Sequence, residues 1–341
     1  MRVQLLAWWS RVRDRLARLF RRARTEPGHY EQGTRGSLTG WVGVAPWVLP
    51  RREYLVYVPR GHGGWRRGPM IVLLHGCKQS PEEIAQGTRI AALADRMGAV
   101  VLLPRQHPRA NAWGCWNWFD RATSSGRGEA AIVAAQIRSV RRRYRVHRRR
   151  VFLAGMSSGA ALAAIVALHR PHLVAGAFLH SGLPAGAASS PLAASEVMQR
   201  GPDVDVAALA RALRDAHGRA IPLMVVHGGA DTVVGMRNAE ALVEQFLALT
   251  PDPERQAGPQ DTTDEEIAPA RRLRVQEWRR EGRLVVRLAV VEGLGHAWSG
   301  GDDTMPFNDA APPDATALLE AFIADTSAPK PRGTWPWRSR A

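Results

Sequence analysis

The sequence predicts an α/β fold in which a mostly parallel sheet is covered by helices on both faces. Continuous apolar runs, typical of strands buried on both faces of a parallel sheet, occur at 53–58, 70–75, 99–103, 151–154, 174–180, 221–227 and 284–291. Amphipathic helical patterns lie between most of these runs, at 82–97, 128–145, 158–169, 204–217 and 237–249, and a last one spans 313–325. In such a sheet, ligands bind beyond the carboxyl ends of the strands.

Three segments lack either pattern. Residues 25–50 are rich in Gly, Pro and Thr and are expected to form a linker or an irregular lead-in. Residues 251–268 are polar and are interpreted as a surface insertion, and residues 326–341 form a tail rich in Pro and Arg.

Composition excludes several classes of protein. The 341 residues are 45% hydrophobic and 23% charged, which is typical of a globular chain and unlike a disordered one. No run of about 18 apolar residues occurs, so no membrane-spanning helix is expected. Two cysteines, Cys77 and Cys115, are too few for a disulfide-dense scaffold or a four-cysteine zinc site. We expect neither a metal nor a cofactor.

The charge is strongly basic, with 47 basic against 31 acidic residues and a net charge of +16. Such a balance suggests nucleic acid or an anionic surface as a partner. However, no helix-turn-helix, zinc-finger or RNA-binding motif accompanies it. The arginine run at 141–150 ends a helical pattern and is interpreted as a solvated helix end, where arginines complement the helix dipole. We therefore expect no specific nucleic acid partner.

Residues 1–24 form a basic amphipathic pattern. On a helical projection every arginine lies outside one apolar arc, which contains Leu5, Trp8, Trp9, Val12, Leu16, Leu19 and Phe20. We predict that this helix lies on an anionic membrane or an apolar granule surface. The alternatives are an unusual export signal, a mispredicted start codon, or a helix docked on the flank of the sheet.

A candidate nucleophile follows the apolar run at 151–154. The motif Gly155-Met156-Ser157-Ser158-Gly159 lies between a strand pattern and a helical pattern. This is the context of a nucleophile elbow, in which a sharp turn exposes a serine at the amino end of a helix. The alternative is an ordinary turn containing Gly and Ser. The context favours Ser157 as the nucleophile.

A candidate acid and a candidate base follow later strands. Asp231 comes directly after the run at 221–227, and His296 follows the last run at 284–291. Their order along the chain matches a Ser, Asp, His triad. Five other histidines are competing candidates for the base, but none of them follows the last strand. They are His169, His172, His180, His217 and His227. Asp203 and Asp205 are weaker candidates for the acid, because no apolar strand directly precedes them.

Two backbone amides are candidates for an oxyanion hole. One is the amide of Ser158, directly after the nucleophile, and the other is the amide of Cys77, in the loop after the strand at 70–75. The mechanism then expected is attack by Ser157, with His296 as base and Asp231 orienting it. His75 is interpreted as a residue that shapes the loop.

These motifs together resemble the poly(3-hydroxybutyrate) depolymerase family of esterases, which have the α/β-hydrolase fold. The matching stretches are LLHGC (73–77), LPRQHPRANAWGCWNWF (103–119), RGEAA (127–131), RVFLAGMSSGAALA (150–163), HGGADTVV (227–234), GLGHAWSGG (293–301) and MPFNDAAPPDAT (305–316). The resemblance implies an ester hydrolase with Ser157, Asp231 and His296 as its triad. We expect the chain to consist of a basic amphipathic helix and linker (1–36), a catalytic domain (37–325) and a tail rich in Pro and Arg (326–341).

The sequence departs from the family at two points. In the segment Gly155-Met156-Ser157-Ser158-Gly159-Ala160, relatives usually read S-A-G-G at the nucleophile. Secreted polymer depolymerases of this type usually append a linker and a substrate-binding domain, and only sixteen residues follow position 325 here.

The cysteines and several tryptophans lie in these segments. Cys77 and Cys115 are interpreted as one disulfide, because the family is mostly exported, and two free thiols are the alternative. Flat apolar rings suit an acyl chain in a cleft. The tryptophans expected to contact substrate, with core packing as the alternative, are Trp113, Trp116, Trp118 and Trp298.

The resulting function hypothesis is a serine carboxylic-ester hydrolase acting on poly- or oligo(3-hydroxyalkanoate) esters. One alternative is a feruloyl or acetylxylan esterase acting on plant polysaccharide. Another is a non-catalytic binding protein on a hydrolase fold. The family resemblance implies an extracellular or envelope-associated protein, and a cytoplasmic, surface-associated one is the alternative.

Overall fold

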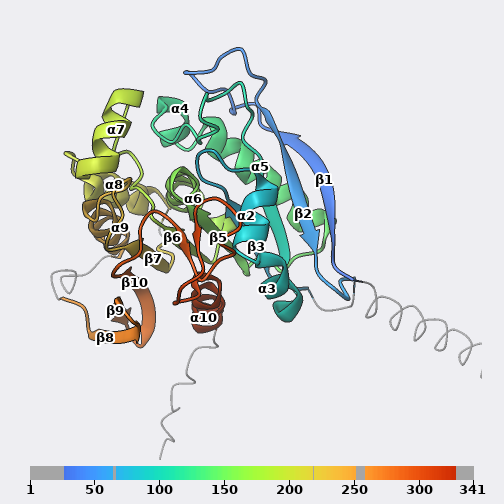
Figure 1. Cartoon of the computed structure of the whole chain (residues 1–341). Coiled ribbons are helices and arrows are strands. Elements are labelled where there is room, and N and C mark those ends of the chain that lie inside the picture. The colour runs from blue at the N-terminus through green and yellow to red at the C-terminus, as the bar shows by residue number, and fades with distance from the viewer. Residues whose placement is uncertain (1–26, 64–66, 218, 251–257, 328–341) are drawn as a thin grey trace, which may run out of the picture.

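A ten-stranded sheet forms the centre of the computed structural model, which describes residues 27–63, 67–217, 219–250 and 258–327 (Figure 1). The strand order is β1-β2-β4-β3-β5-β6-β7-β10-β9-β8. The bounds are β1 His29–Gly36, β2 Arg51–Val58, β3 Met70–Leu74, β4 Val100–Pro104, β5 Val151–Met156, β6 Gly176–His180, β7 Leu223–Gly228, β8 Asp261–Ala268, β9 Arg271–Arg280 and β10 Arg283–Val291. Two short strands, β11 Trp298–Ser299 and β12 Asn308–Asp309, pair separately.

The centre of the sheet is parallel and its two margins are antiparallel. β4, β3, β5, β6, β7 and β10 run parallel to one another. β2 and β1 continue the sheet antiparallel at one margin, and β9 and β8 do so at the other. The carboxyl ends of β3, β5, β7 and β10 therefore meet at one edge of the sheet, where the predicted site residues follow them.

Helices cover both faces of the sheet. Their bounds are α2 Pro81–Gly87, α3 Ile90–Met97, α4 Arg121–Ser124, α5 Gly128–Arg143, α6 Ser158–His169, α7 Pro191–Arg200, α8 Val206–His217, α9 Arg237–Leu247 and α10 Ala315–Ser327, with a 3-10 turn at Pro171–Leu173. One core cluster joins α5, α6, α8 and α9 to one face, and a second joins α2, α3 and α10 to the other. The α/β architecture predicted from the sequence is therefore confirmed.

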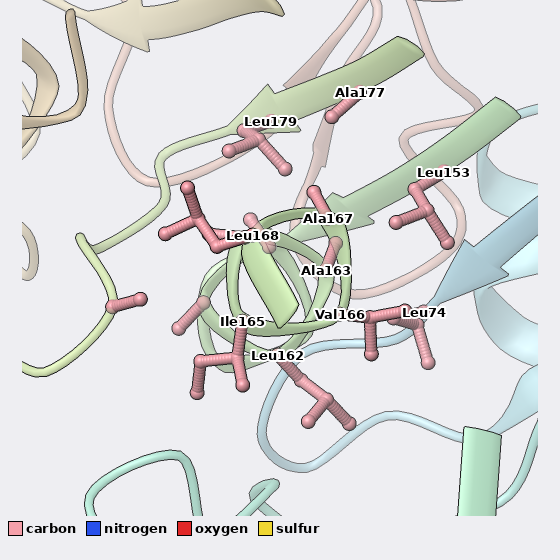
Figure 2. Close-up of a cluster of buried hydrophobic side chains, with 14 of the residues drawn as sticks. Leu74, Leu153, Leu162, Ala163, Ile165, Val166, Ala167, Leu168, Ala177 and Leu179 are labelled. Atoms are coloured by element: carbon pink, nitrogen blue, oxygen red, sulfur yellow. The ribbon is translucent and has the colours of Figure 1, made fainter. Parts of the chain in front are cut away.

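α6 lies wholly inside the molecule. Every one of its 12 residues is buried. Figure 2 shows Ala163 and Ala167 on the side of the helix that faces the strands carrying Leu153, Ala177 and Leu179. Small side chains let the helix approach the sheet closely, and a helix that is apolar all round must be buried. The serine that precedes its amino end is thereby attached to a close-packed part of the core.

Three strands at the margins of the sheet differ from the sequence-based expectation. Residues 29–36, expected as part of a linker, form β1, and residues 261–268, expected in a surface insertion, form β8. β9 was not predicted at all. All three strands are polar; β1 and β8 are largely exposed, and most residues of β9 are half-buried. β1 pairs with β2, β9 with β10 and β8 with β9 through main-chain hydrogen bonds. None of the three needs the continuous apolar run that identified the central strands.

The helix expected at 82–97 is two helices. α2 begins with a capping box between Ser80 and Glu83 and ends at Thr88, and Arg89 then has a left-handed backbone with φ of 53°. The Arg89 guanidinium donates to the carbonyl oxygens of Gly300 and Gly301. Arg89, between α2 and α3, therefore joins these helices to the loop that follows His296. Within the described residues, no helix is long and apolar enough to cross a membrane.

Candidate active site

Ser157 occupies a strained turn between β5 and α6. Its φ of 55° and ψ of −125° are unusual for a residue with a Cβ atom, and its main-chain N–H donates to the carbonyl of His180 at 2.9 Å. A Cβ at Gly155 would lie 2.7 Å from the main chain of Gly159, and one at Gly159 would collide with the carbonyl oxygens of Leu74 and His75. Both glycines are therefore required by close packing, as a nucleophile elbow demands.

Asp231 and His296 meet at the same edge of the sheet. His296 Nδ1 donates to Asp231 Oδ2 at 2.8 Å, and the Asp231 side chain has no exposed surface. The other carboxylate oxygen, Oδ1, accepts from the main-chain amides of Val233 and Val234. Main-chain bonds also join the two loops, because the amide of Ala230 donates to the carbonyl of Leu294 at 2.9 Å. The aspartate is therefore held as a fixed acceptor for the imidazole.

The electrostatics of this pair favour an ionised aspartate. Burial raises the pKa of the Asp231 carboxyl, but the hydrogen bond and positive charge of His296 and the amide of Val234 outweigh burial and bring the pKa down to about 2. An ionised Asp231 accepts from Nδ1, so the proton of neutral His296 lies on Nδ1 and Nε2 is left as a base. Ser157 makes no hydrogen bond with His296 in the described part of the chain, and such bonds often tighten only when substrate is bound.

The loop after β3 lies against the nucleophile. A Cβ at Gly76 would lie 3.4 Å from Ser157 Cβ, so the loop passes directly beside the serine. The main-chain N–H of Gly76 donates to Gln79 Oε1 at 2.9 Å. Among the described residues no acceptor pairs with the main-chain N–H of Cys77 or of Ser158. These two amides are the predicted oxyanion donors, and they remain free to bind an oxyanion.

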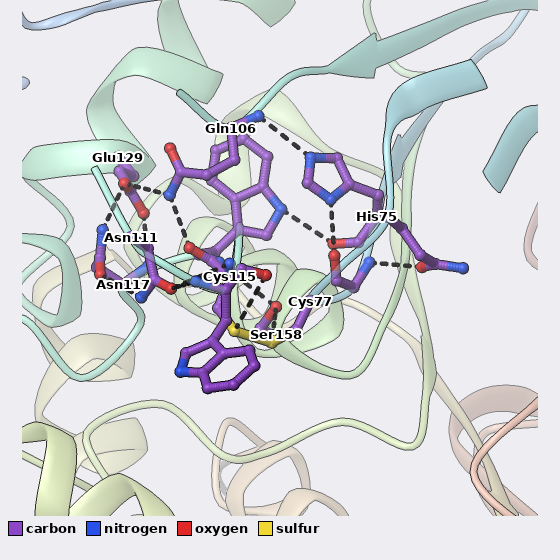
Figure 3. Close-up of a disulfide and its surroundings, with 12 residues drawn as sticks. His75, Cys77, Gln106, Asn111, Cys115, Asn117, Glu129 and Ser158 are labelled. Atoms are coloured by element: carbon purple, nitrogen blue, oxygen red, sulfur yellow. Dashed lines mark hydrogen bonds between the residues drawn. A yellow bond between two sulfur atoms is a disulfide. The ribbon is translucent and has the colours of Figure 1, made fainter. Parts of the chain in front are cut away.

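A disulfide ties this loop to the segment after β4 (Figure 3). Cys77 and Cys115 are bonded, with their Cα atoms 4.1 Å apart, so the predicted pairing is confirmed. The Trp116 main-chain N–H donates to the Ser158 hydroxyl at 3.4 Å, and the Trp116 indole donates to the carbonyl of His75 at 3.0 Å. The disulfide and Trp116 thus hold both candidate oxyanion amides in place.

His75 has the role in loop shape expected from the sequence. It is buried, and burial lowers the pKa of its imidazole to about 4, so the ring is neutral. Nε2 accepts from the main-chain N–H of Gln106 at 3.1 Å, and Nδ1 donates to the carbonyl of Gly76 at 2.8 Å. The ring therefore joins the loop after β3 to the loop after β4.

A buried charged network lies behind the disulfide and was not predicted from the sequence. Glu129 is completely buried and accepts from the main-chain amide of Asn117 at 2.7 Å, from Gln106 Nε2 at 2.7 Å and from Arg52 Nη2 at 3.3 Å. Gln106 also donates to the carbonyl of Cys115 at 2.9 Å. Because these partners are far apart in the sequence, only RGEAA as a family motif pointed to Glu129.

The structure buries three of the four tryptophans that were expected to contact substrate. Trp116, Trp118 and Trp298 are 0, 3 and 1% exposed and pack into the two cores. These three tryptophans therefore pack in the core, which was the alternative left open by the sequence. Trp113 is 63% exposed, and the Lys78 ammonium lies 4.7 Å from the centre of its ring. The sequence could not separate them, because adjacent aromatic residues give no indication of which face they occupy.

Phe307 is a further exposed aromatic residue at the site. It is 36% exposed, and its ring centre lies 6.5 Å from that of His296. Its carbonyl accepts from the main-chain N–H of Trp298 at 2.8 Å, which fixes it beside the histidine. The family stretch at 305–316 indicated this segment without singling out the residue.

The competing histidines on the strands are buried and neutral. The His180 ring stacks on Trp298 with 5.1 Å between ring centres, and burial lowers its pKa to about 3. His227 Nε2 lies 2.9 Å from the carbonyl of Val234, and burial lowers its pKa too. Neither is placed as a base. Across the described ranges, no group of three or more His, Cys, Asp and Glu side chains is arranged to hold a metal.

The sheet order, the serine turn and the Asp–His pair together define an α/β-hydrolase. The sequence pattern of the family described as "Esterase PHB depolymerase" matches residues 52–269, and the chain belongs to this family.

Several characterised proteins are similar to it. Over 206 residues the chain is 30% identical to poly(3-hydroxyalkanoate) depolymerase C of Paucimonas lemoignei, covering 58% of this chain and 49% of that protein. Over 191 residues it is 27% identical to acetylxylan esterase A of Aspergillus oryzae, covering 53% and 61%. The matches thus span about half to three fifths of these relatives. Among solved structures, an acetyl xylan esterase from Aspergillus awamori superposes with a TM-score of 0.63 at 21% identity, covering 79% of this chain and 94% of that one.

Proposed function

We propose that this chain is a serine carboxylic-ester hydrolase that acts on poly- or oligo(3-hydroxyalkanoate) esters. The observation that carries the proposal is the strained Ser157 turn at the same sheet edge as the hydrogen-bonded Asp231–His296 pair. Backbone strain of this kind clusters at active sites. The family and its depolymerase relative support the substrate class.

The mechanism has two halves. Ser157 Oγ attacks the ester carbonyl carbon while His296 Nε2 takes its proton, and the carbonyl oxygen becomes an oxyanion that the amides of Cys77 and Ser158 bind. Collapse expels the alcohol, which takes the proton back from His296, and leaves an acyl group on Ser157. Water, deprotonated by His296, then attacks the acyl carbon; the bond from that carbon to Ser157 Oγ breaks, His296 returns the proton to Oγ, and the carboxylic acid leaves. Asp231 stabilises the imidazolium in both halves.

Two exposed rings are proposed as substrate contacts. Trp113 is in the segment joined by the disulfide to the oxyanion loop, and Phe307 lies beside His296. Flat apolar surfaces at these positions suit the methyl-bearing chain of a hydroxyalkanoate ester. The bond between Cys77 and Cys115 also supports export to an oxidising compartment, outside the cell or in its envelope.

An acetylxylan or feruloyl esterase is the second candidate. It is favoured by the acetylxylan esterase relatives and by the superposition with an acetyl xylan esterase. The discriminating measurement is the ratio of kcat/KM values for hydroxybutyrate oligomers, acetylated xylan and methyl ferulate. Preference for either polysaccharide substrate would replace the hydroxyalkanoate assignment and leave the serine mechanism in place.

The mechanism is tested by Ser157→Ala with Ser181→Ala as a matched control. Ser181 is buried and also has a positive φ, of 48°. Loss of a triad serine typically lowers kcat on the order of 10⁴–10⁶-fold. We expect this loss for Ser157→Ala, together with loss of labelling by a fluorophosphonate, and much higher activity for the control. Near-normal turnover by Ser157→Ala would refute the mechanism. A wild-type chain that neither hydrolyses esters nor takes the label would indicate a binding protein.

A further inference from the structure

The amino ends of the central strands carry a dense cluster of arginines. The loop after α5 packs against the start of β3, where the His147 N–H donates to the carbonyl of Gly68 at 2.9 Å and the Met70 N–H to that of Arg150 at 2.8 Å. We call this cluster the basic edge. Its members are Arg141, Arg142, Arg143, Arg145, Arg148, Arg149 and Arg150.

Most of this charge is not neutralised by the protein. Arg143 pairs with Glu31 at 2.6 Å. Arg142, Arg145, Arg148 and Arg149 are exposed, and no ion pair is found for them among the described residues. The basic edge therefore presents uncompensated positive charge to solvent, and such a surface attracts an anionic partner.

The basic edge lies opposite the candidate active site. Val151, directly after the arginines, begins β5, and Ser157 follows the end of the same strand. Six residues of strand at about 3.3 Å each separate the two by roughly 20 Å. A partner on the basic edge therefore leaves the serine uncovered.

Both ends of the described chain also lie near the basic edge. β1 begins at His29, which pairs with Val58 at the end of β2, and Glu31 contacts Arg143 and Tyr144. In α10, Phe322 lies against Gly176 at the start of β6, near the end of the helix. Figure 1 shows both ends on the lower side of the molecule.

The adjoining sequences are basic and contain paired tryptophans. Residues 1–26 contain eight arginines with Trp8 and Trp9, and residues 328–341 contain three arginines and Lys330 with Trp335 and Trp337. Tryptophan is enriched at the interface between a membrane and water, and basic residues bind anionic headgroups. Both basic sequences thus adjoin ends of the described chain that lie near the basic edge.

We infer that the basic edge docks on an anionic lipid bilayer, with the candidate active site facing away from the membrane. The contact is electrostatic and reversible, because salt screens the attraction between exposed arginines and lipid headgroups. The paired tryptophans favour lipid over nucleic acid, because their rings have an apolar body and a polar N–H. A disulfide-containing fold is typical of oxidising compartments, which include the bacterial periplasm and the cell surface. The docking does not depend on the esterase assignment.

The test is co-sedimentation of the full chain with phosphatidylglycerol-containing vesicles and with neutral phosphatidylcholine vesicles. Arg148→Gln/Arg149→Gln removes two charges from the basic edge. Arg200→Gln/Arg237→Gln is the matched control, because both arginines are exposed and lie near the carboxyl end of β7. Each basic residue near an anionic surface contributes about 1 kcal/mol, or roughly fivefold in affinity. We expect the basic-edge variant, which lacks two such residues, to bind anionic vesicles roughly 25-fold more weakly, and the control to bind like the parent.

Other outcomes would overturn the inference. Equal losses for both variants would show attraction to net charge alone, and unchanged binding by the basic-edge variant would show that this edge makes no contact. Tighter binding to a DNA duplex than to anionic vesicles at the same salt would make nucleic acid the partner. Orientation is read separately: vesicle-bound protein should react with a soluble fluorophosphonate as fast as free protein. Slower labelling of bound protein, when free protein reacts, would show that the site faces the membrane.

Discussion

Replacing Glu129 by glutamine tests whether the buried network supports the candidate active site. Glu129→Gln keeps the shape of the side chain and removes its negative charge. The carboxylate oxygen Oε2 that accepts from the Asn117 amide at 2.7 Å becomes an NH₂ group in one orientation, so two donors face each other. In the other orientation the NH₂ group faces Arg52, Gln106 and the Asn117 side chain, which are the donors to Oε1. Neither orientation satisfies the site.

The expected cost follows from burial. Arg52 is only 2% exposed, so loss of its partner leaves an uncompensated buried charge. Breaking a buried pair in this way costs about 3–5 kcal/mol. For a domain of this size each kcal/mol lowers Tm by roughly 2–4 °C, so Tm should fall by about 6–20 °C. Arg52→Met combined with Glu129→Gln removes the unpaired charge and should recover part of the loss.

Thermal and urea unfolding measure the effect, with Glu244→Gln as the control because Glu244 is exposed on α9. The control should change stability by less than about 0.5 kcal/mol. Because Gln106 and Asn117 position the segment that contains Cys115, kcat for ester hydrolysis should also fall, by roughly tenfold or more, with KM little changed. A loss of stability below about 1 kcal/mol, or a rise in KM at unchanged kcat, would refute the reasoning.

Three further predictions concern the same site. The Asp231 carboxyl has a pKa of about 2 in the folded protein and about 3.9 when unfolded. It therefore contributes stability on the order of 2 kcal/mol that is present above about pH 4 and is lost as the pH falls towards 2. Urea unfolding across this pH range should show a smaller decline in stability for Asp231→Asn than for the parent, and equal declines would contradict the assignment. Reduction of the Cys77–Cys115 disulfide, which spans 38 residues, should lower the free energy of unfolding by about 3–4 kcal/mol, as measured with and without dithiothreitol; an unchanged unfolding curve of the reduced protein would count against it. Trp113→Ala should raise KM at unchanged Tm, whereas Trp116→Ala should lower Tm by removing a fully buried ring; the reverse result would exchange their roles.

The central strands and the three candidate catalytic residues could be predicted because their features are local. Buried parallel strands require continuous apolar runs, and the Ser157 turn requires glycines at fixed positions beside it. Asp231 and His296 were predicted to meet because each directly follows a strand of the same sheet, and their side chains do hydrogen-bond.

Features that depend on distant partners could not be predicted in the same way. β9 is identified by its register against β10, since its own side chains alternate only weakly between buried and exposed. In the sequence, Glu129 looks like any acidic residue in the first turn of a helix. Its role depends on the fold, which brings the Arg52 guanidinium into an ion pair with it. Trp113 and Trp116 are three positions apart, yet one is exposed and the other buried, because the loop between them turns at Gly114, which has φ of 64°.

The two outermost strands of the sheet have a consequence for solubility. An open sheet exposes unpaired main-chain groups at each margin, where the strand of another molecule could add and start aggregation. β8 ends the sheet on one side with the exposed acidic residues Asp261, Asp264, Glu265 and Glu266. A second copy of β8 would bring like charges together, and the resulting repulsion opposes edge-to-edge pairing. The polar sequence that made β8 hard to predict thus also opposes the addition of a strand from another molecule to this margin of the sheet.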